Sequence, residues 1–243
     1  MGVIIPPSIM MVVWGGLMSV SIGGLFMAGI LPGCLIALLM MATVLAYARR
    51  RNYPVYERTT LKEFLRALGS ASLALVTPAI IIGGIVGGLF TPTEASVVAV
   101  VYSALLGGVI YRSLKLKDFS KVVYDSARFA AISLFCIGSL FCIGTASAFG
   151  WLLACYRIPQ ALVDVIAGWG SGPMTTGFLI ALAFLFDGMF IDAIPVIIVL
   201  GTVLMSLAVN VSMHPIHFAI IGIISLAFGL VTPPYGLCLL ISC

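Results

Sequence analysis

The chain has 243 residues, of which 62% are hydrophobic and only 8% are charged, and its mean hydropathy is +1.25. An ordinary soluble domain has roughly 25% charged residues, so this composition excludes a water-soluble globule and predicts that lipid faces most of the chain. We expect an all-α, polytopic membrane protein, because backbone in lipid must satisfy its own hydrogen bonds and no barrel-like alternation is visible.

Most of the charge is confined to two short stretches. Residues 49–69 hold six basic and two acidic side chains, and residues 112–128 hold five basic and two acidic ones. The positive-inside rule predicts that both stretches are cytoplasmic loops. The excess of basic residues in these two predicted loops thus accounts for the net charge of +4. No aromatic stacking motif accompanies the basic residues, so a nucleic-acid partner is not expected.

The first apolar segments contain helix-breaking residues. Residues 1–20 hold a proline pair followed by apolar side chains, and residues 21–48 form a run of membrane-spanning length. The first half of that run contains four glycines and Pro32. We therefore expect a poor uninterrupted helix there.

The chain between the two basic stretches must cross the membrane an even number of times if both are cytoplasmic. Residues 70–111 would measure roughly 63 Å as a helix, about two bilayer thicknesses. This length predicts an out-and-back pair, 70–90 and 95–111, that turns near 91–94. Residues 129–155 are a further apolar span rich in small residues.

The last third of the chain is apolar but interrupted. Asp187-Gly188 and Asp192 break the apolar run of residues 174–209. The apolar segment at 216–230 has about 15 residues, too few for a full crossing, which needs about 20.

Neither the acidic nor the histidine residues of this region predict catalysis or metal binding. Asp187 and Asp192 lie five residues apart, which turns a helix by about 500°, so the two carboxylates would face different directions. His214 and His217 lack the HExxH spacing of a zinc site. We expect no enzyme activity and no cofactor.

Two proline pairs stand in corresponding places near the two ends of the chain. Residues 4–8 and 230–234 each set a Pro-Pro pair beside a hydroxyl residue within an apolar stretch. Proline removes a backbone donor and disfavours helix at the residue before it, so each pair predicts a helix break at membrane depth. Such breaks must line protein or a water-filled cavity. One Pro-Pro pair alone favours a helix that simply ends at a membrane surface, whereas two matched pairs, each joined to a half-length apolar segment, favour the binding site of a transporter. Exposed carbonyls there suit a cation, and exposed N–H groups suit an anion.

Two acidic residues outside the basic stretches are candidates for a role near such a site. Glu94 has two interpretations: with Thr91 or Thr93 it stabilises the start of a helix, or it lies near a transport path. Asp192 is either a gating or ion-path residue or a buried, hydrogen-bonded structural acid.

Eight sequence strings occur in the order and spacing of one known family. They are GVIIPPSI (2–9), AGILPG (28–33), ARRRNYP (48–54), GGLFTPTEA (87–95), ASAFGW (146–151), GMFID (188–192), HPIHF (214–218) and GLVTPPYG (229–236). Together they span nearly the whole chain, which resembles the large membrane subunit of TRAP transporters.

The resemblance implies a sodium-driven secondary importer of organic acids, typically C4-dicarboxylates, sialic acids or keto acids, in the bacterial inner membrane. A small membrane subunit and a periplasmic substrate-binding protein are the implied partners. The implied fold has inverted repeats, an elevator-type transport domain and two re-entrant hairpins, here partly present at 1–20 and 216–243. On this view the chain is a fragment that begins inside the first hairpin and stops just after the second tip.

The resemblance also implies where substrate and ion bind. The substrate carboxylate and sodium are expected between the two hairpin tips, with sodium held largely by backbone carbonyls near Ser8 and Thr232. Residues of the two tips are Pro6, Pro7, Ser8, Gly229, Thr232, Pro233 and Pro234. Ser19 and Ser21 either supply further oxygens to sodium or bond back to their own helix. The role of Asp187 is open, because a neutral residue is expected there.

Two other functions are compatible with the residues. One is a related ion-coupled anion symporter that works without a binding protein. The other is a membrane-embedded structural subunit that transports nothing, for which the proline breaks would be dispensable.

Overall fold

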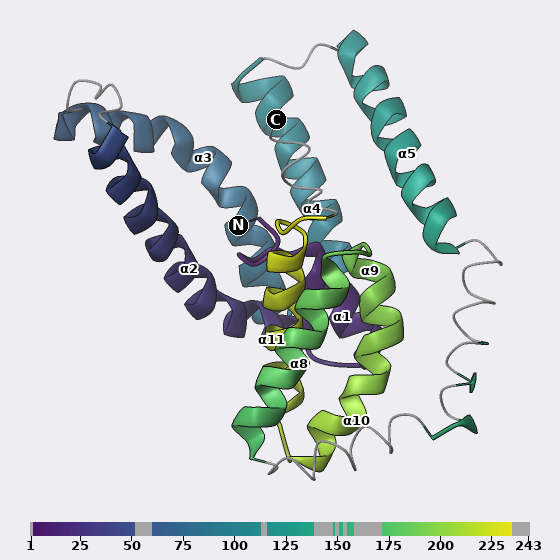
Figure 1. Ribbon diagram of the computed structural model, residues 1–243. Coiled ribbons are helices and arrows are strands. Elements are labelled where there is room, and N and C mark those ends of the chain that lie inside the picture. Colours follow the sequence, from purple (N-terminus) through teal and green to yellow (C-terminus); the bar gives the residue numbers. More distant parts are fainter. Residues whose placement is uncertain are drawn as a thin grey trace.

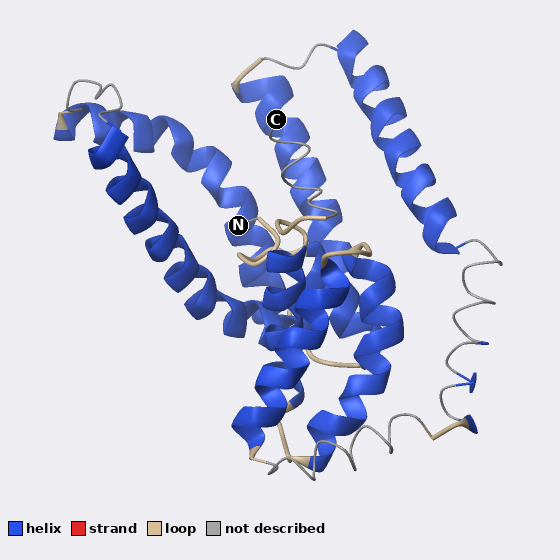
Figure 2. Cartoon of the chain, in the orientation of Figure 1, coloured by secondary structure: helices blue, strands red, loops and turns tan. Residues whose placement is uncertain are grey.

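The computed structural model describes residues 2–51, 60–112, 116–138, 148, 151–152, 155–157 and 172–234. Every regular element within these described residues is a helix (Figure 2). In chain order the elements are α1 (Ile9–Met18), α2 (Ile22–Arg51), α3 (Leu61–Val86), α4 (Pro92–Leu105), the π-helical turn η1 (Leu106–Ile110), α5 (Leu116–Gly138), α8 (Pro173–Gly188), α9 (Ala193–Val196), the π-helical turn η2 (Ile197–Gly201), α10 (Thr202–Asn210) and α11 (Pro215–Gly229).

The described helices fall into long and short classes. Four segments are long and apolar enough to cross a membrane: α2, α3, Pro92–Ile110 and Ala193–Asn210. Helices α1, α8 and α11 are apolar but have only 10, 16 and 15 residues. This confirms the predicted all-helical, polytopic fold over the described part of the chain.

The out-and-back pair predicted between the basic stretches is present as α3 and α4. The Tyr102 hydroxyl donates to the Leu73 carbonyl at 2.8 Å, and the Tyr111 hydroxyl donates to the Ser70 carbonyl at 3.1 Å. These contacts align the end of the second helix with the first half of the first, so the two run antiparallel. Gly88, at a φ of +69°, lies in the turn between them, where a side chain would be strained.

The prediction of a poor helix at 21–48 is wrong, because α2 is continuous through Pro32. Its glycines form a contact face instead of a break. A Cβ at Gly29 would lie 2.4 Å from Met11 Cε and 3.3 Å from the Ile4 carbonyl oxygen. Gly33 faces the same segment of chain. Local composition misled here because glycine has a second use, close approach of two backbones.

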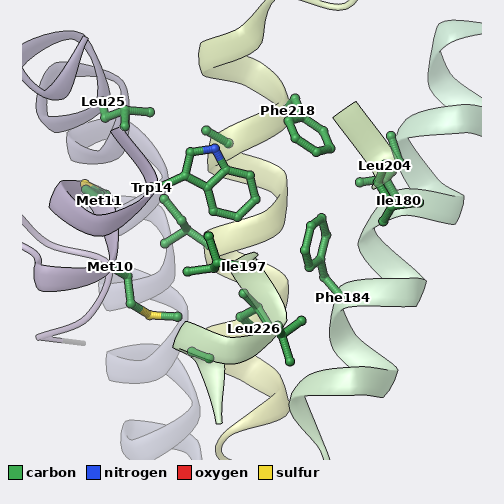
Figure 3. Close-up of a cluster of buried hydrophobic side chains, with 14 of the residues drawn as sticks. Met10, Met11, Trp14, Leu25, Ile180, Phe184, Ile197, Leu204, Phe218 and Leu226 are labelled. Atoms are coloured by element: carbon green, nitrogen blue, oxygen red, sulfur yellow. The ribbon is translucent and has the colours of Figure 1, made fainter. Parts of the chain in front are cut away.

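Five elements near the two proline pairs pack into one bundle. Helices α1, α8, α9, α10 and α11 share a buried core with η2 and with Leu25 and Phe26 of α2 (Figure 3), whereas most of α2 and α3, and α4 and α5, extend away from it (Figure 1). Three aromatic rings, Trp14, Phe184 and Phe218, lie 5.4 to 6.0 Å apart between centroids. Aromatic pairs at this spacing add stabilisation beyond their buried area.

Helices α8 and α11 run parallel and touch along their length. Gly177 faces Met213 and Ile221 near the start of both helices, and Gly188 faces Gly229 where both end. The returning segment α9–α10 lies between them in the chain and makes the parallel arrangement possible.

The basic residues of 49–69 lie partly on helix ends. Arg49, Arg50 and Arg51 form the last turn of α2, and α3 begins at Leu61. The Thr60 N–H donates to Glu63 Oε2 at 2.9 Å, which stabilises the start of α3. The cytoplasmic placement of this stretch stays a prediction.

The contact between α8 and α11 gives a test of the packing. A Cβ at Gly229 would lie 2.7 Å from the Gly188 carbonyl carbon and 2.9 Å from the Leu185 carbonyl oxygen. These atoms belong to backbone and cannot move aside, so Gly229→Ala should lower the stability of the protein in detergent by about 1–3 kcal/mol. Gly69→Ala is the control, because a Cβ there meets nothing within 4 Å. Equal unfolding temperatures for the two variants would contradict the close contact between α8 and α11.

Candidate functional site

The first proline pair interrupts the chain before α1. Residues 2–7 form turns, and Ser8 begins the helix as its N-cap. The Ser8 hydroxyl donates to the Val3 carbonyl and accepts the Met11 N–H at 3.5 Å. Ser8 and Pro6 are buried, whereas Pro7 is exposed. The serine side chain therefore holds the shape of the break.

The second proline pair interrupts the chain after α11. Thr232 is half-buried, its hydroxyl donates to the Phe228 carbonyl at 2.5 Å, and its N–H donates to the Gly229 carbonyl at 3.0 Å. Pro233 and Pro234 are exposed, and the peptide bond between them is cis, as it is between Pro6 and Pro7. The hydroxyl residue beside each proline pair is thus bonded to nearby backbone.

The fold brings the two breaks to the same end of the bundle. Helix α1 begins at the first break and α11 ends at the second, and the two helices pack against each other through Trp14 and Gly222. Figure 1 shows both breaks at the same level, on the side from which α2 and α3 extend. The fold thus places two breaks that are more than 220 positions apart in the sequence at the same end of one bundle.

A third break lies beside the second one. Helix α8 ends at Gly188, and the chain turns over 189–192 before α9, with the Asp187 carbonyl accepting the Phe190 and Ile191 N–H groups. Gly188 touches Gly229, so Asp187 lies close to the end of α11. The sequence showed the interruption but gave no sign of this neighbour, because the contact joins residues 41 positions apart.

Asp192 and Asp187 differ in their surroundings. Asp192 is exposed at the N-cap position of α9 and makes no capping hydrogen bond. The interpretation of Asp192 as a buried structural acid is therefore wrong. Asp187 is half-buried at the end of α8.

Glu94 forms a capping box with Thr91 at the start of α4. The Thr91 N–H donates to Glu94 Oε2 at 2.8 Å, and the Glu94 N–H donates to Thr91 Oγ1 at 3.3 Å. Both side chains are exposed. This confirms the helix-capping interpretation of Glu94, whereas its place on a transport path stays a prediction.

Ser19 and Ser21 lie in the link between α1 and α2. Ser19 has a φ of 54° and ends α1, with its N–H donated to the Gly15 carbonyl. The Ser21 hydroxyl accepts the Gly24 N–H at 3.2 Å, so it bonds to the helix that follows. Both residues are exposed.

Sets of metal ligands are absent from the part of the chain that the structure describes, where no three His, Cys, Asp or Glu side chains gather. His214 has a structural role instead: its Nδ1 accepts the Ile216 N–H at 3.3 Å and caps α11.

An apolar helical protein whose short helices are interrupted at paired prolines has the architecture of a secondary-transporter component. The whole chain, residues 1–243, matches the family described as "Tripartite ATP-independent periplasmic transporter, DctM component". The chain belongs to this family, whose members are transporter permeases of the inner membrane and not enzymes.

Curated relatives extend over nearly the whole chain. It is 35% identical over 239 residues to the sialic acid TRAP transporter large permease protein SiaM of Vibrio cholerae, covering 98% of the chain and 54% of that protein. It is 34% identical over 242 residues to the C4-dicarboxylate TRAP transporter large permease protein DctM of Pseudomonas aeruginosa, covering 100% of the chain and 55% of that protein. With the ectoine/5-hydroxyectoine TRAP transporter large permease protein UehC of Ruegeria pomeroyi the identity is 37% over 237 residues, covering 96% and 53%. The chain spans about half the length of these relatives.

Substitutions at Glu94 distinguish its two interpretations, helix capping and a role on a transport path. Glu94→Ala should destabilise the full-length permease by about 1 kcal/mol, because the Thr91 N–H loses its partner. Glu94→Gln keeps an acceptor at the same place and should retain both stability and uptake. Thermal unfolding and uptake of labelled substrate measure the two effects. Normal stability but lost uptake in Glu94→Gln would instead favour a charge on the transport path.

Proposed function

We propose that this chain forms the substrate- and ion-binding part of the large permease of a sodium-coupled TRAP transporter that imports organic acids. The observation that carries the proposal is the pair of Pro-Pro breaks held at the same end of one packed bundle. Membership of the DctM family supports it, as do relatives named for sialic acid and C4-dicarboxylate transport.

In this proposal the ion ligands are backbone carbonyls at the two breaks. Pro234 has no N–H, so the Leu230 carbonyl lacks its helical i+4 donor, and in this proposal it faces the cation. Sodium, a hard cation, prefers such oxygen ligands. The hydroxyls of Ser8 and Thr232 contribute by fixing the backbone around the carbonyls.

The substrate carboxylate is proposed to bind between the same breaks, near backbone N–H groups at the ends of the short helices. The start of α1, at Ser8, supplies the positive end of a helix dipole on the side of the first break. Sodium bound at the tips then compensates the charge of the carboxylate. This sharing of charge is the physical basis for coupling the two.

The movement we propose is of elevator type, with the two breaks as tips of re-entrant hairpins in the moving domain. The partners proposed are a small membrane subunit and a periplasmic substrate-binding protein that delivers the organic acid. Large apolar side chains remain exposed along α2, α3 and α4, as in Leu31 at 80% and Val100 at 68%. Lipid and the small subunit are the proposed neighbours of these faces.

Uptake by the full-length permease, reconstituted with its partner proteins, tests the proposal. Labelled C4-dicarboxylate or sialic acid should accumulate when sodium is present outside the vesicles and should not when potassium replaces it. Equal uptake of every organic acid tried, with and without sodium, would contradict the proposed coupling.

The hydroxyls at the breaks give a sharper test of the site. Thr232→Ala and Ser8→Ala should each raise the half-saturating sodium concentration by about tenfold, equivalent to about 1.4 kcal/mol, because the carbonyls lose their fixed positions. Thr232→Ser keeps the hydroxyl and should behave as the natural protein does. Thr43→Ala is the matched control, since the Thr43 hydroxyl donates to the Met40 carbonyl on α2, away from both breaks. Unchanged sodium dependence in both alanine variants would refute the role of these side chains.

A further inference from the structure

One face of α1 carries three large side chains, spaced three and four residues apart, that each sit on a glycine of another element. At this spacing side chains share a face of the helix. The three pairs are Met11 with Gly29 of α2, Trp14 with Gly222 of α11, and Met18 with Gly201 of η2. Through this face helix α1 packs closely against three other elements.

The central pair is the tightest. Trp14 is completely buried, and a Cβ at Gly222 would lie 2.3 Å from its Cη2 atom and 2.8 Å from its Cζ3 atom. The same Cβ would lie 3.2 Å from Phe184 Cε2. Figure 3 shows the indole reaching from α1 toward the aromatic rings of Phe184 and Phe218. No side chain fits at position 222 while Trp14 is seated.

The contact between Trp14 and Gly222, called the seat here, lies near the middle of both α1 and α11, the two helices that lead to the proline breaks. Trp14 is six residues after Ser8, and Gly222 is seven residues before Gly229. At 1.5 Å per residue these separations are about 9 and 10 Å along the helix axes. Because α1 begins at the first break and α11 ends at the second, the seat sets how far each break projects relative to the other.

The contact acts by shape and not by hydrogen bonding. Trp14 Nε1 is buried and has no hydrogen-bond partner among the residues that the structure describes. Replacing the indole by a phenyl ring therefore removes no bond from the described structure, and it keeps an aromatic ring in the seat. This separates the volume of the side chain from its polarity.

We propose that Trp14, seated on Gly222, is a positioning residue that couples the two proline breaks, so that loosening one loosens the other. The purpose of this coupling rests on the proposed function: the coupling makes the second break ready to bind sodium when the first break is in place. The coupling itself belongs to the bundle and can be measured without transport.

Amide hydrogen exchange of the full-length permease measures the coupling directly. Trp14→Leu should raise the exchange rate of the backbone amides at 230–232 by about tenfold, although the substitution lies on α1. Trp14→Phe should leave it within about twofold of the natural protein. Leu17→Ala is the matched control, because Leu17 is on the same helix and 46% exposed. Equal exchange at 230–232 in Trp14→Leu and Leu17→Ala would overturn the proposal.

A double substitution distinguishes coupling from general damage. Gly222→Ala forces the indole out of its seat and should raise the half-saturating sodium concentration for uptake by about tenfold. Gly222→Ala combined with Trp14→Leu, in which the indole is already missing, should raise it no further than the larger of the two single effects. Gly16→Ala, where a Cβ meets nothing within 4 Å, should have no effect.

The possible failures are distinguishable. Additive effects of Gly222→Ala and Trp14→Leu would overturn the coupling, since independent sites add and coupled ones do not. Natural protein without sodium-dependent uptake would overturn the proposed function, and the exchange experiment would still decide the coupling.

Discussion

Backbone that faces lipid has no water to bond to, so a helix can stop at membrane depth only where the break is buried in protein or lines a water-filled cavity. Two proline pairs stop helices in this chain, and a hydroxyl side chain bonds to the backbone beside each of them. Around the first break Ser8 returns a hydroxyl to the Val3 carbonyl, and around the second Thr232 does the same for Phe228. The short helices α1 and α11 bury their faces against each other and against α8, whereas Pro7, Pro233 and Pro234 remain exposed.

Glycine makes the close packing of these helices possible. Between helices in a membrane the hydrophobic effect offers little attraction, so close packing has to supply it. Gly29, Gly201 and Gly222 receive large side chains from α1, and Gly188 receives the backbone at Gly229. Because these glycines accept large side chains at close range, a glycine-rich chain can form an ordered core.

Local signals in the sequence predicted local structure well. Thr91 and Glu94 lie in a pattern whose reciprocal bonds involve only four residues, and the turn between α3 and α4 follows from glycine and proline at neighbouring positions. The paired breaks were likewise visible in the residues that cause them. The continuity of α2 was not predicted, because its glycines are explained by Met11 and Ile4, far away in the sequence. For the same reason the seat of Trp14 and the neighbour of Asp187 could not be read from spacing: each depends on residues that only the fold brings together.

The distance in sequence between the two halves of the aromatic cluster also bears on how the protein is made. Trp14 and Phe218 are separated by 204 positions, which a ribosome covers in about 10–40 s at 5–20 residues per second. During that time the face of α1 that bears Trp14 has no α11 to pack on. An apolar face lacking its partner is a ready contact for other hydrophobic chains, so α1 depends on the insertion machinery or on neighbouring lipid until synthesis reaches α11. The core therefore closes only after the long helices α2, α3 and α4 have been synthesised.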